Sequence, residues 1–224
     1  MKLNRVEKAL MNNPVRALVQ RHYEARLMER LGGRLGGMRV LEIGCGCGVG
    51  TEIIFGRFGA REVHAFDLDP DMVARARRRL AAYPQERLRL FVGDAAAVEA
   101  EDGFYDAVVD FGIVHHVPDW RRAVAEVSRV LRPGGLFLFE EVTRQALSRR
   151  FYRTFLKHPP PECWFTAGEF VAELERQGVA VGENVAGWFF GDFVVGVGRR
   201  ESASQSLRAV PPLTREEEME RCEV

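Results

Sequence analysis

Residues 40–51, with the sequence VLEIGCGCGVGT, restrict the fold of this chain more than any other stretch. A short apolar run leads into a loop in which glycine stands at every second position, at residues 44, 46 and 48. Each glycine loses backbone entropy on folding, so a loop this bare indicates that something must approach the backbone closely. A strand, a glycine-rich loop and a following helix form the opening unit of a nucleotide-binding α/β domain.

Short apolar runs recur along the chain and predict the strands of one sheet. They cover residues 39–43, 61–66, 87–92, 105–111 and 135–142. Each run but the last is soon followed by a helix-like segment, most clearly at residues 50–58, 70–83 and 119–131. Runs that are apolar on both faces and alternate with helices indicate a parallel sheet covered on both sides.

The flanking segments complete this arrangement. Residues 3–31 predict helix divided at Pro14, and the glycines of GGRLGG end it, so residues 1–37 form an N-terminal helical cap. Residues 165–178 predict a further helix, and two runs between residues 179 and 200 predict a late strand pair. The expected fold is a doubly wound, mostly parallel, Rossmann-like α/β sheet of about seven strands, with helices on both faces.

The chain length of 224 residues suits one domain with added segments, and we place that domain at residues 38–200. Residues 201–224 form a polar C-terminal tail. Acidic and basic residues balance at 32 each, so no overall field attracts nucleic acid, and no nucleic-acid partner is expected. The four cysteines have no zinc-site spacing, so we expect no metal and a reducing, cytoplasmic setting. The N-terminus lacks a signal-peptide core, and no run is long enough to span a bilayer.

Two common nucleotide-binding loops do not fit the glycine spacing. The third glycine of a G-x-G-x-x-G dinucleotide motif would fall on Val49 or Thr51, and no G-K-[ST] follows to make a P-loop. The G-x-G-x-G spacing preceded by Glu42 resembles the first motif of class I S-adenosylmethionine-dependent methyltransferases, of the type 11 kind. The resemblance continues through VHAFDLDPDMV, FVGDAAAV, FYDAVVDFGIVHHVPDW and LRPGGLFLFEEV, and covers roughly residues 38–200.

The resemblance implies S-adenosylmethionine as the cofactor and gives each site residue a role. Asp67 would accept hydrogen bonds from the ribose hydroxyls, and it lies about 20 residues beyond the glycines, as a ribose-binding acid does. Glu42 would order the glycine loop and the methionine amino group, and Asp94 would lie near the adenine amino group. Phe111 would border the methionine and the acceptor. The full set of expected cofactor-binding residues is Glu42, Gly44, Gly46, Gly48, Asp67, Leu68, Met72, Asp94, Ala95 and Phe111.

Simpler structural roles remain open for several of these residues. Asp67 and Asp94 could be helix caps or turn residues, and Asp69, directly before Pro70, is predicted to be an N-cap. Cys45 and Cys47 are interpreted as small residues that fill the loop. The candidates for a catalytic role are His115, His116 and Glu140. None is required, because the rate of methyl transfer from an activated sulfonium depends mainly on alignment of the acceptor and on exclusion of water.

Acceptor selectivity in such enzymes is expected in added segments, here residues 144–166, which we interpret as a lid. Aromatic and basic residues alternate in it, which also predicts a weak contact with a membrane surface. The expected activity is methyl transfer to a small molecule, such as a hydrophobic quinone precursor or a lipid-like compound. The alternatives are a tRNA or protein methyltransferase and a non-catalytic, cofactor-binding partner subunit. The sequence leaves the oligomeric state open.

Overall fold

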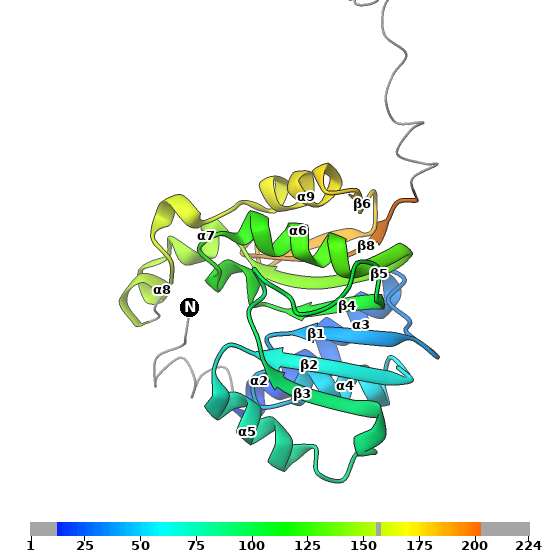
Figure 1. The fold of residues 1–224 in the computed structure, drawn as a ribbon. Helices are drawn as coiled ribbons and strands as arrows, with labels where there is room; N and C mark the ends of the chain where they lie inside the picture. The colour runs from blue at the N-terminus through cyan, green and yellow to red at the C-terminus, as the bar shows by residue number, and fades with distance from the viewer. Residues whose placement is uncertain (1–12, 156–157, 203–224) are drawn as a thin grey trace, which may run out of the picture.

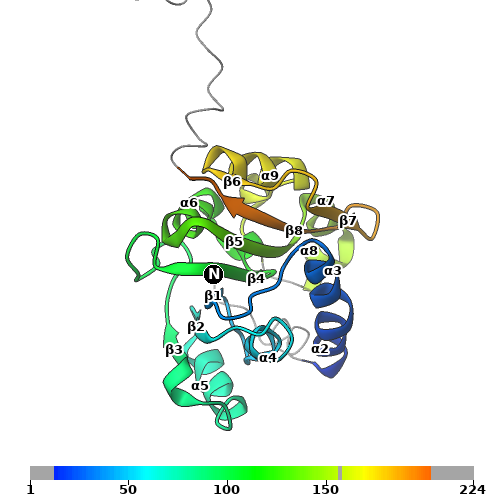
Figure 2. The same cartoon turned by 90° about the vertical axis from the view of Figure 1, so that its right-hand side faces the viewer.

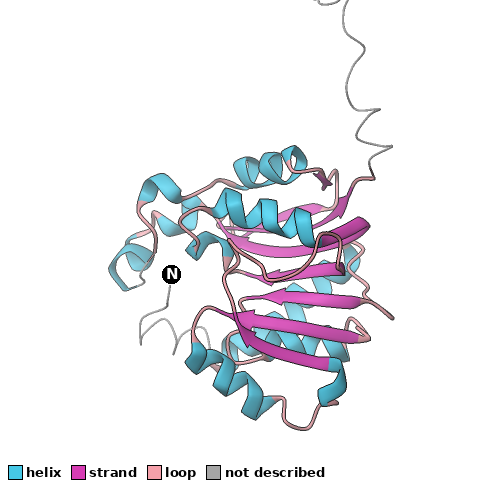
Figure 3. Ribbon diagram, viewed as in Figure 1, coloured by secondary structure: helices cyan, strands magenta, loops and turns pink. Residues whose placement is uncertain are grey.

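The computed structural model describes residues 13–155 and 158–202, which form an eight-stranded sheet between two layers of helices (Figure 1, Figure 3). The strand order is β3-β2-β1-β4-β5-β8-β6, and β7 pairs with β8 outside this path. The strands are β1 (Arg39–Ile43), β2 (Glu62–Asp67), β3 (Leu88–Val92), β4 (Tyr105–Phe111), β5 (Leu131–Val142), β6 (Val179–Ala180), β7 (Val185–Trp188) and β8 (Phe193–Arg200). This arrangement confirms the predicted doubly wound α/β fold.

Strands β1 to β5 run parallel, and β8 is antiparallel to β5. Neighbouring residues of β1 face opposite sides of the sheet, and both sides are buried. Val40 belongs to the hydrophobic cluster on one face and Leu41 to the cluster on the other. The chain order of the strands reverses at β1, which lies between β2 and β4. In open α/β sheets a crevice forms beyond the carboxyl ends of the strands at such a reversal, and ligands bind there.

Helices cover both faces of the sheet. One face is covered by α4 (Val49–Gly56), α5 (Pro70–Arg79) and the N-terminal helical segment, and the other by α6 (Trp120–Val130) and α9 (Ala167–Arg176). The N-terminal segment consists of α2 (Pro14–Val19), η1 (Gln20–Glu24) and α3 (Ala25–Arg30). It lies on one flank below the β7–β8 hairpin (Figure 2), and the rings of Tyr23 and Trp188 join the two, with centroids 4.9 Å apart.

The N-terminal cap begins where its sequence allows. Pro14 is the first residue of α2, which agrees with the predicted division there, because proline fits the first turn of a helix. The Asn13 side chain accepts the Arg16 backbone N–H at 2.9 Å. The predicted helical residues 3–12 lie outside the described part of the chain, as does the tail beyond residue 202. The capping box of α9, formed by Thr166 and Glu169, confirms the helix predicted at residues 165–178.

Two local predictions were wrong. No helix follows β3, because the Asp94 carboxylate accepts the Ala96 N–H at 2.9 Å and Asp94 pairs with Ala97, which closes a turn instead. Ala95 and Val98 of this loop are buried and take the place of a helix over the sheet. The single strand predicted over residues 179–190 divides into β6 and β7 at a turn closed from the Asn184 N–H to the Val181 carbonyl. Both short strands pair with β8, so the sheet has eight strands instead of seven.

Short helices follow β5 beyond the carboxyl ends of the parallel strands (Figure 1). They are α7 (Arg144–Leu147), α8 (Arg150–Phe155) and η4 (Pro161–Cys163). The two other short turns are η2 (Gln85–Arg87) and η3 (Val114–His116). Within residues 13–155 and 158–202, no helix combines the length and the apolar character needed to cross a bilayer.

Candidate active site

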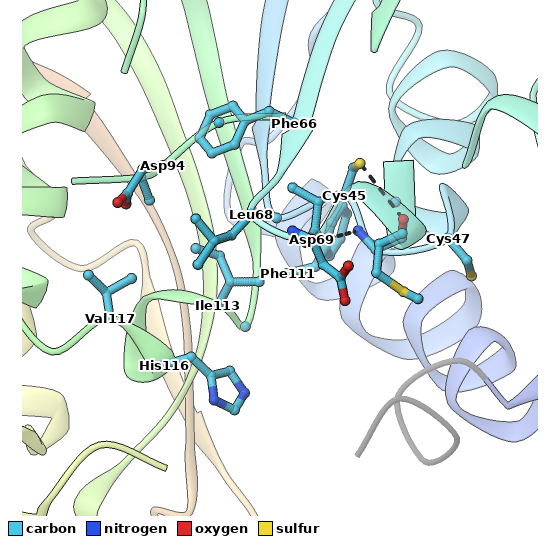
Figure 4. A pocket seen from close by; sticks show the side chains of 18 of the residues that line it. Cys45, Cys47, Phe66, Leu68, Asp69, Asp94, Phe111, Ile113, His116 and Val117 are labelled. Carbon is cyan, nitrogen blue, oxygen red and sulfur yellow. Dashed lines mark hydrogen bonds between the residues drawn. The ribbon is translucent and has the colours of Figure 1, made fainter. Parts of the chain in front are cut away.

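A cavity of about 370 Å³ opens at the carboxyl ends of β1, β2 and β4, at the point where the strand order reverses (Figure 4). Eight of the ten residues predicted to bind the cofactor line this cavity. They are Gly44, Gly46, Asp67, Leu68, Met72, Asp94, Ala95 and Phe111. The two exceptions, Glu42 and Gly48, lie outside the lining. Residues that are far apart in the sequence thus surround one space.

The glycine loop is bare because side chains already occupy the space around it. A Cβ on Gly44, which has φ +71°, would lie 2.3 Å from Cγ2 of Ile113. A Cβ on Gly50 would lie 2.1 Å from Oε1 of Glu42 and 2.7 Å from the Phe111 ring. Gly50 lines the cavity, but the G-x-G-x-G spacing did not single it out. The geometry therefore requires glycine here for packing as well as for ligand access.

Gly48 has a structural role in this loop. It is the N-cap residue of α4 at φ +89°, and a Cβ there would lie 3.0 Å from Cδ1 of Leu80, away from the cavity. The resemblance implied a cofactor contact at this position. Gly48 serves the left-handed turn into α4 and the packing of that turn on α5, and the cofactor contact at this position stays a prediction.

Asp67 connects the end of β2 to the glycine loop. Its carboxylate accepts the Gly46 N–H at 2.9 Å and the Asp69 N–H at 2.8 Å. Asp69 is the N-cap of α5, as predicted, and its side chain accepts the Asp71 N–H at 3.0 Å. These bonds hold two cavity loops in register, and Asp67 itself lines the cavity.

The remaining wall of the predicted cofactor site follows β2 and β3. Met72 and Ala95 are buried, whereas Leu68 is partly exposed. Asp94 is exposed, lines the cavity and uses one carboxylate oxygen for its own turn. Figure 4 shows Asp94 and Leu68 on the same side of the glycine loop. An apolar wall with few polar groups is typical of a site for a flat ring.

Glu42 lies behind the cavity wall. Its carboxyl group is buried and accepts a hydrogen bond from the Thr51 hydroxyl. Burial raises the pKa of Glu42 to about 8, so the group carries its proton near neutral pH. This bond joins β1 to the first turn of α4, which agrees with the predicted ordering of the glycine loop.

The N-terminal helical segment supplies two cavity residues that the sequence did not single out. Arg16 and Gln20 line the cavity from α2 and η1. Arg16 donates to Glu24 at 2.6 Å and to Glu140 at 3.1 Å, and both carboxyl groups are buried. Glu140, a predicted catalytic candidate, is thus held by an ion pair and lies outside the cavity lining. Burial raises its pKa, although the Arg16 charge opposes that shift.

The two predicted histidine candidates differ in environment, and a third histidine joins them. His115 is buried, and its Nδ1 lies 2.7 Å from Oε2 of Glu141. His116 lines the cavity, and its ring centroid lies 4.1 Å from that of His115 and 4.9 Å from that of His158. Burial lowers the pKa of both His115 and His116 well below the usual range, so both rings are neutral near pH 7. His158 stands outside every sequence motif, so only the fold brings it here.

The predicted lid divides into a part near the cavity and a part in the core. Tyr152 is half-buried, and its ring centroid lies 6.3 Å from that of His158. Phe165, in contrast, is buried and packs with Trp120 and Phe170 at centroid distances of 4.8 Å. The Arg149 guanidinium bonds to Asp192 at 2.8 Å and anchors the segment to the β7–β8 connection. Lys157, a basic residue of the predicted lid, lies outside the described residues.

Cys45 and Cys47 both line the cavity as free thiols. Cys45 is buried, and burial raises its pKa well above the usual value, so it is not a reactive thiolate. These positions agree with the prediction of small residues that fill the loop.

Comparison with known proteins relates the central part of the chain to a protein family. Residues 40–135 match the model of a methyltransferase domain. A probable S-adenosylmethionine-dependent methyltransferase of Mycolicibacterium smegmatis is 36% identical over 163 residues, which are 73% of this chain and 60% of that protein. These matches identify residues 40–135 as an S-adenosylmethionine-dependent methyltransferase domain. Demethylmenaquinone methyltransferase of Staphylococcus aureus is 30% identical over 155 residues, which are 67% of this chain and 63% of that protein.

The fold of the chain is that of the same methyltransferases. A crystal structure of an S-adenosylmethionine-dependent methyltransferase from Aquifex aeolicus superposes with a TM-score of 0.67 at 21% identity, covering 88% of this chain and 98% of the other. The chain spans about 60% of the length of the two curated relatives described above. The cofactor of this family is S-adenosylmethionine, and the cavity fits it. Bare backbone at Gly44 and Gly46 and a carboxylate at Asp67 suit a nucleoside whose ribose hydroxyls need an acceptor.

Proposed function

We propose that this protein transfers a methyl group from S-adenosylmethionine to a small, largely apolar acceptor. The observation that carries this proposal is the convergence of the glycine loop, Asp67, Asp94 and Phe111 on one cavity. These residues come from the ends of four neighbouring strands, where an α/β sheet binds its ligand. The match to a methyltransferase domain supports the reaction class.

Different cavity residues would bind different parts of the cofactor. Asp67 would accept hydrogen bonds from both ribose hydroxyls while it holds the Gly46 N–H in place. Asp94 would accept a hydrogen bond from the adenine amino group, and Met72 and Leu68 would cover the ring. Glu42 stabilises the loop through Thr51 rather than by lining the cavity.

The bound cofactor supplies an activated methyl group on a cationic sulfur. The protein then has to align the acceptor and keep water away. Phe111, Ile113 and Val117 line the cavity beside η3 and provide an apolar wall for this purpose (Figure 4). Effective molarities of about 10⁵–10⁸ M are available from alignment alone. Positioning therefore supplies most of the rate in this proposal.

An apolar acceptor suits these lining residues. Ile113, Val117 and Pro118 extend the wall beyond the predicted cofactor contacts. The relative from Staphylococcus aureus is named for demethylmenaquinone, whose ring and tail have this character. We therefore propose an acceptor of the quinone-precursor or lipid-like class.

The proposed function is tested in two steps. Calorimetry should detect binding of S-adenosylhomocysteine and no comparable binding of NAD or ATP. Transfer is then measured with methyl-labelled cofactor against a panel of quinols, fatty acids and hydrophilic amines, with heat-inactivated protein as the blank. Equal affinity for NAD contradicts the cofactor assignment, and transfer only to hydrophilic amines contradicts the acceptor class.

We also propose that the protein touches a membrane surface near the cavity. Phe190 and Phe189, between β7 and β8, are 92% and 64% exposed. The adjoining α8 region carries exposed Arg149 and Arg150, and Arg149 bonds to Asp192 of the same connection. Exposed aromatic rings beside basic residues are a common means of binding the surface of an anionic bilayer. Such contact would bring the cavity close to a lipid-like acceptor.

A further inference from the structure

Three histidines meet at the edge of the cavity. His115 and His116 form η3 after β4, and His158 comes from the loop between α8 and η4. One ring nitrogen from each of the three lies within 4.8 Å of the others. Throughout residues 13–155 and 158–202, they are the one group of potential metal ligands gathered this closely. No spacing in the sequence links His158 to the other two.

The hydrogen bonds of Glu141 fix which nitrogen of His115 can bind a ligand. The Glu141 carboxyl accepts the Val114 N–H at 2.6 Å and lies 2.7 Å from Nδ1 of His115. Because the carboxylate is an acceptor, Nδ1 carries the proton and Nε2 carries the lone pair. Metal-binding histidines have this arrangement, in which a carboxylate orients the ring from behind.

We propose that His115, His116 and His158 together bind one divalent transition-metal ion of the zinc type. Imidazole nitrogens are the preferred ligands of such ions, and three of them with one open position form a known catalytic zinc site. Zinc–nitrogen bonds of about 2.0–2.1 Å place tetrahedral ligands about 3.3 Å apart, so the three nitrogens would approach one another by up to about 1.5 Å.

The movement required falls mainly on His158. The rings of His116 and His158 are stacked at an interplanar angle of 11°, so one of them must turn out of the stack to share an ion. His115 is buried and held by Glu141, whereas His158 is half-buried on a loop. A turn of the His158 side chain is therefore the simplest way to complete the site.

The metal site indicates a class of acceptor, and this part of the inference rests on the proposed function. Three protein ligands leave one position open, and His116 lines the cavity next to Val117. A hydroxyl oxygen of the acceptor would occupy that position and lose its proton to water. The oxygen then bonds to the methyl carbon while the carbon–sulfur bond breaks, and the electron pair stays on sulfur. The favoured acceptor is thus a phenol or quinol oxygen.

Titration with Co²⁺ tests the metal site directly, with the full chain first treated with a chelator. Visible absorption should reveal one equivalent in a nitrogen-rich, near-tetrahedral environment, and Zn²⁺ should displace it. His158→Ala and His158→Gln should each weaken binding at least about tenfold, and Glu141→Gln should weaken it about 10–100-fold. His22→Ala is the matched control, because His22 is exposed on the N-terminal helical segment and should leave the titration unchanged.

The outcomes separate this inference from the proposed function. Weak, non-stoichiometric binding by the wild-type protein, or equal affinity in both folded His158 variants, overturns the metal site and leaves only an aromatic stack. Calorimetry with S-adenosylhomocysteine on the same metal-free samples gives the second readout. Cofactor binding without metal binding overturns the site alone, whereas metal binding without cofactor binding overturns the proposed function alone.

Discussion

The Asp67 carboxylate accepts the backbone N–H of Gly46 at 2.9 Å, which ties the end of β2 to the middle of the glycine loop. The same carboxylate accepts the Asp69 N–H at 2.8 Å. One acid at the switch point of the sheet thus shapes two cavity loops before any ligand arrives. A ribose would therefore meet a carboxylate that is already oriented, and this lowers the entropy lost on binding.

Substitution of Asp67 should weaken cofactor binding. Asp67→Ala removes a charged acceptor, and we expect a loss of about 1.5–3 kcal/mol in the binding free energy of S-adenosylhomocysteine. Asp67→Asn, which keeps one acceptor oxygen, should lose less. Calorimetry measures both values. Asp71→Ala is the control, since Asp71 is exposed in the first turn of α5 and lies outside the cavity lining. Unchanged affinity in Asp67→Ala would exclude the ribose contact.

Replacement of most of the predicted lid should separate cofactor binding from methyl transfer. We expect that a Gly-Ser linker in place of residues 149–162 leaves the affinity for S-adenosylhomocysteine within about threefold and abolishes labelled methyl transfer. The replacement ends before Phe165, because that ring is buried between Trp120 and Phe170. Phe165→Ala should instead destabilise the fold by about 3–5 kcal/mol. Loss of cofactor binding in a variant that remains folded would assign the segment to the cofactor site.

The buried Glu42 should make stability depend on pH. Its pKa of about 8 in the folded state exceeds the usual value of 4.5, so the folded protein retains a proton that the unfolded chain releases. The contribution of Glu42 to the free energy of unfolding is fully present below pH 4.5. It falls by up to about 1.4 kcal/mol per pH unit as the pH rises towards 8. Glu42→Gln cannot titrate, so its free energy of unfolding relative to wild type should rise between pH 5 and pH 8. Urea unfolding at three pH values measures the difference, and a constant difference would contradict the raised pKa.

Contact with a lipid surface should depend on the exposed pair Phe189 and Phe190. Their φ values of +54° and +58° are unusual for phenylalanine, and asparagine tolerates them better. The double variant Phe189→Asn/Phe190→Asn should therefore fold normally but sediment less with phosphatidylglycerol-containing vesicles. Phe104→Ser is the control, because Phe104 is a partly exposed ring on the loop before β4. Equal sedimentation of the double variant and the wild type would show that these rings do not contribute to vesicle binding.

The sequence predicted β1, β2, β4 and β5 well because most residues of these strands are buried, on both faces of the sheet, and form a largely apolar run. Asp67, Asp94 and Phe111 could be placed for the same reason, since each stands at or just beyond the end of such a run. Arg16 could not be predicted, because its partners Glu24 and Glu140 meet it only after the N-terminal helical segment lies against the sheet. His158 could not be predicted either, because a loop places it against η3 without any periodic pattern.

The buried ion pairs of Arg16 give the last prediction. Arg16→Met leaves Glu24 and Glu140 buried without their shared cation, and such a loss costs about 3–5 kcal/mol. Burial and the neighbouring Glu140 charge raise the pKa of Glu24 to about 8 in the wild type, and loss of the Arg16 charge raises it further. Glu24 is therefore protonated in both proteins below pH 8, and the destabilisation should grow as the pH rises above 8. Arg21→Met is the matched control on the same segment, because Arg21 pairs with Glu52 at the surface and should contribute less than about 1 kcal/mol. Thermal and urea unfolding of the two variants measure these values. Equal stability of Arg16→Met and Arg21→Met would mean that the N-terminal helical segment is held to the sheet by its apolar face alone.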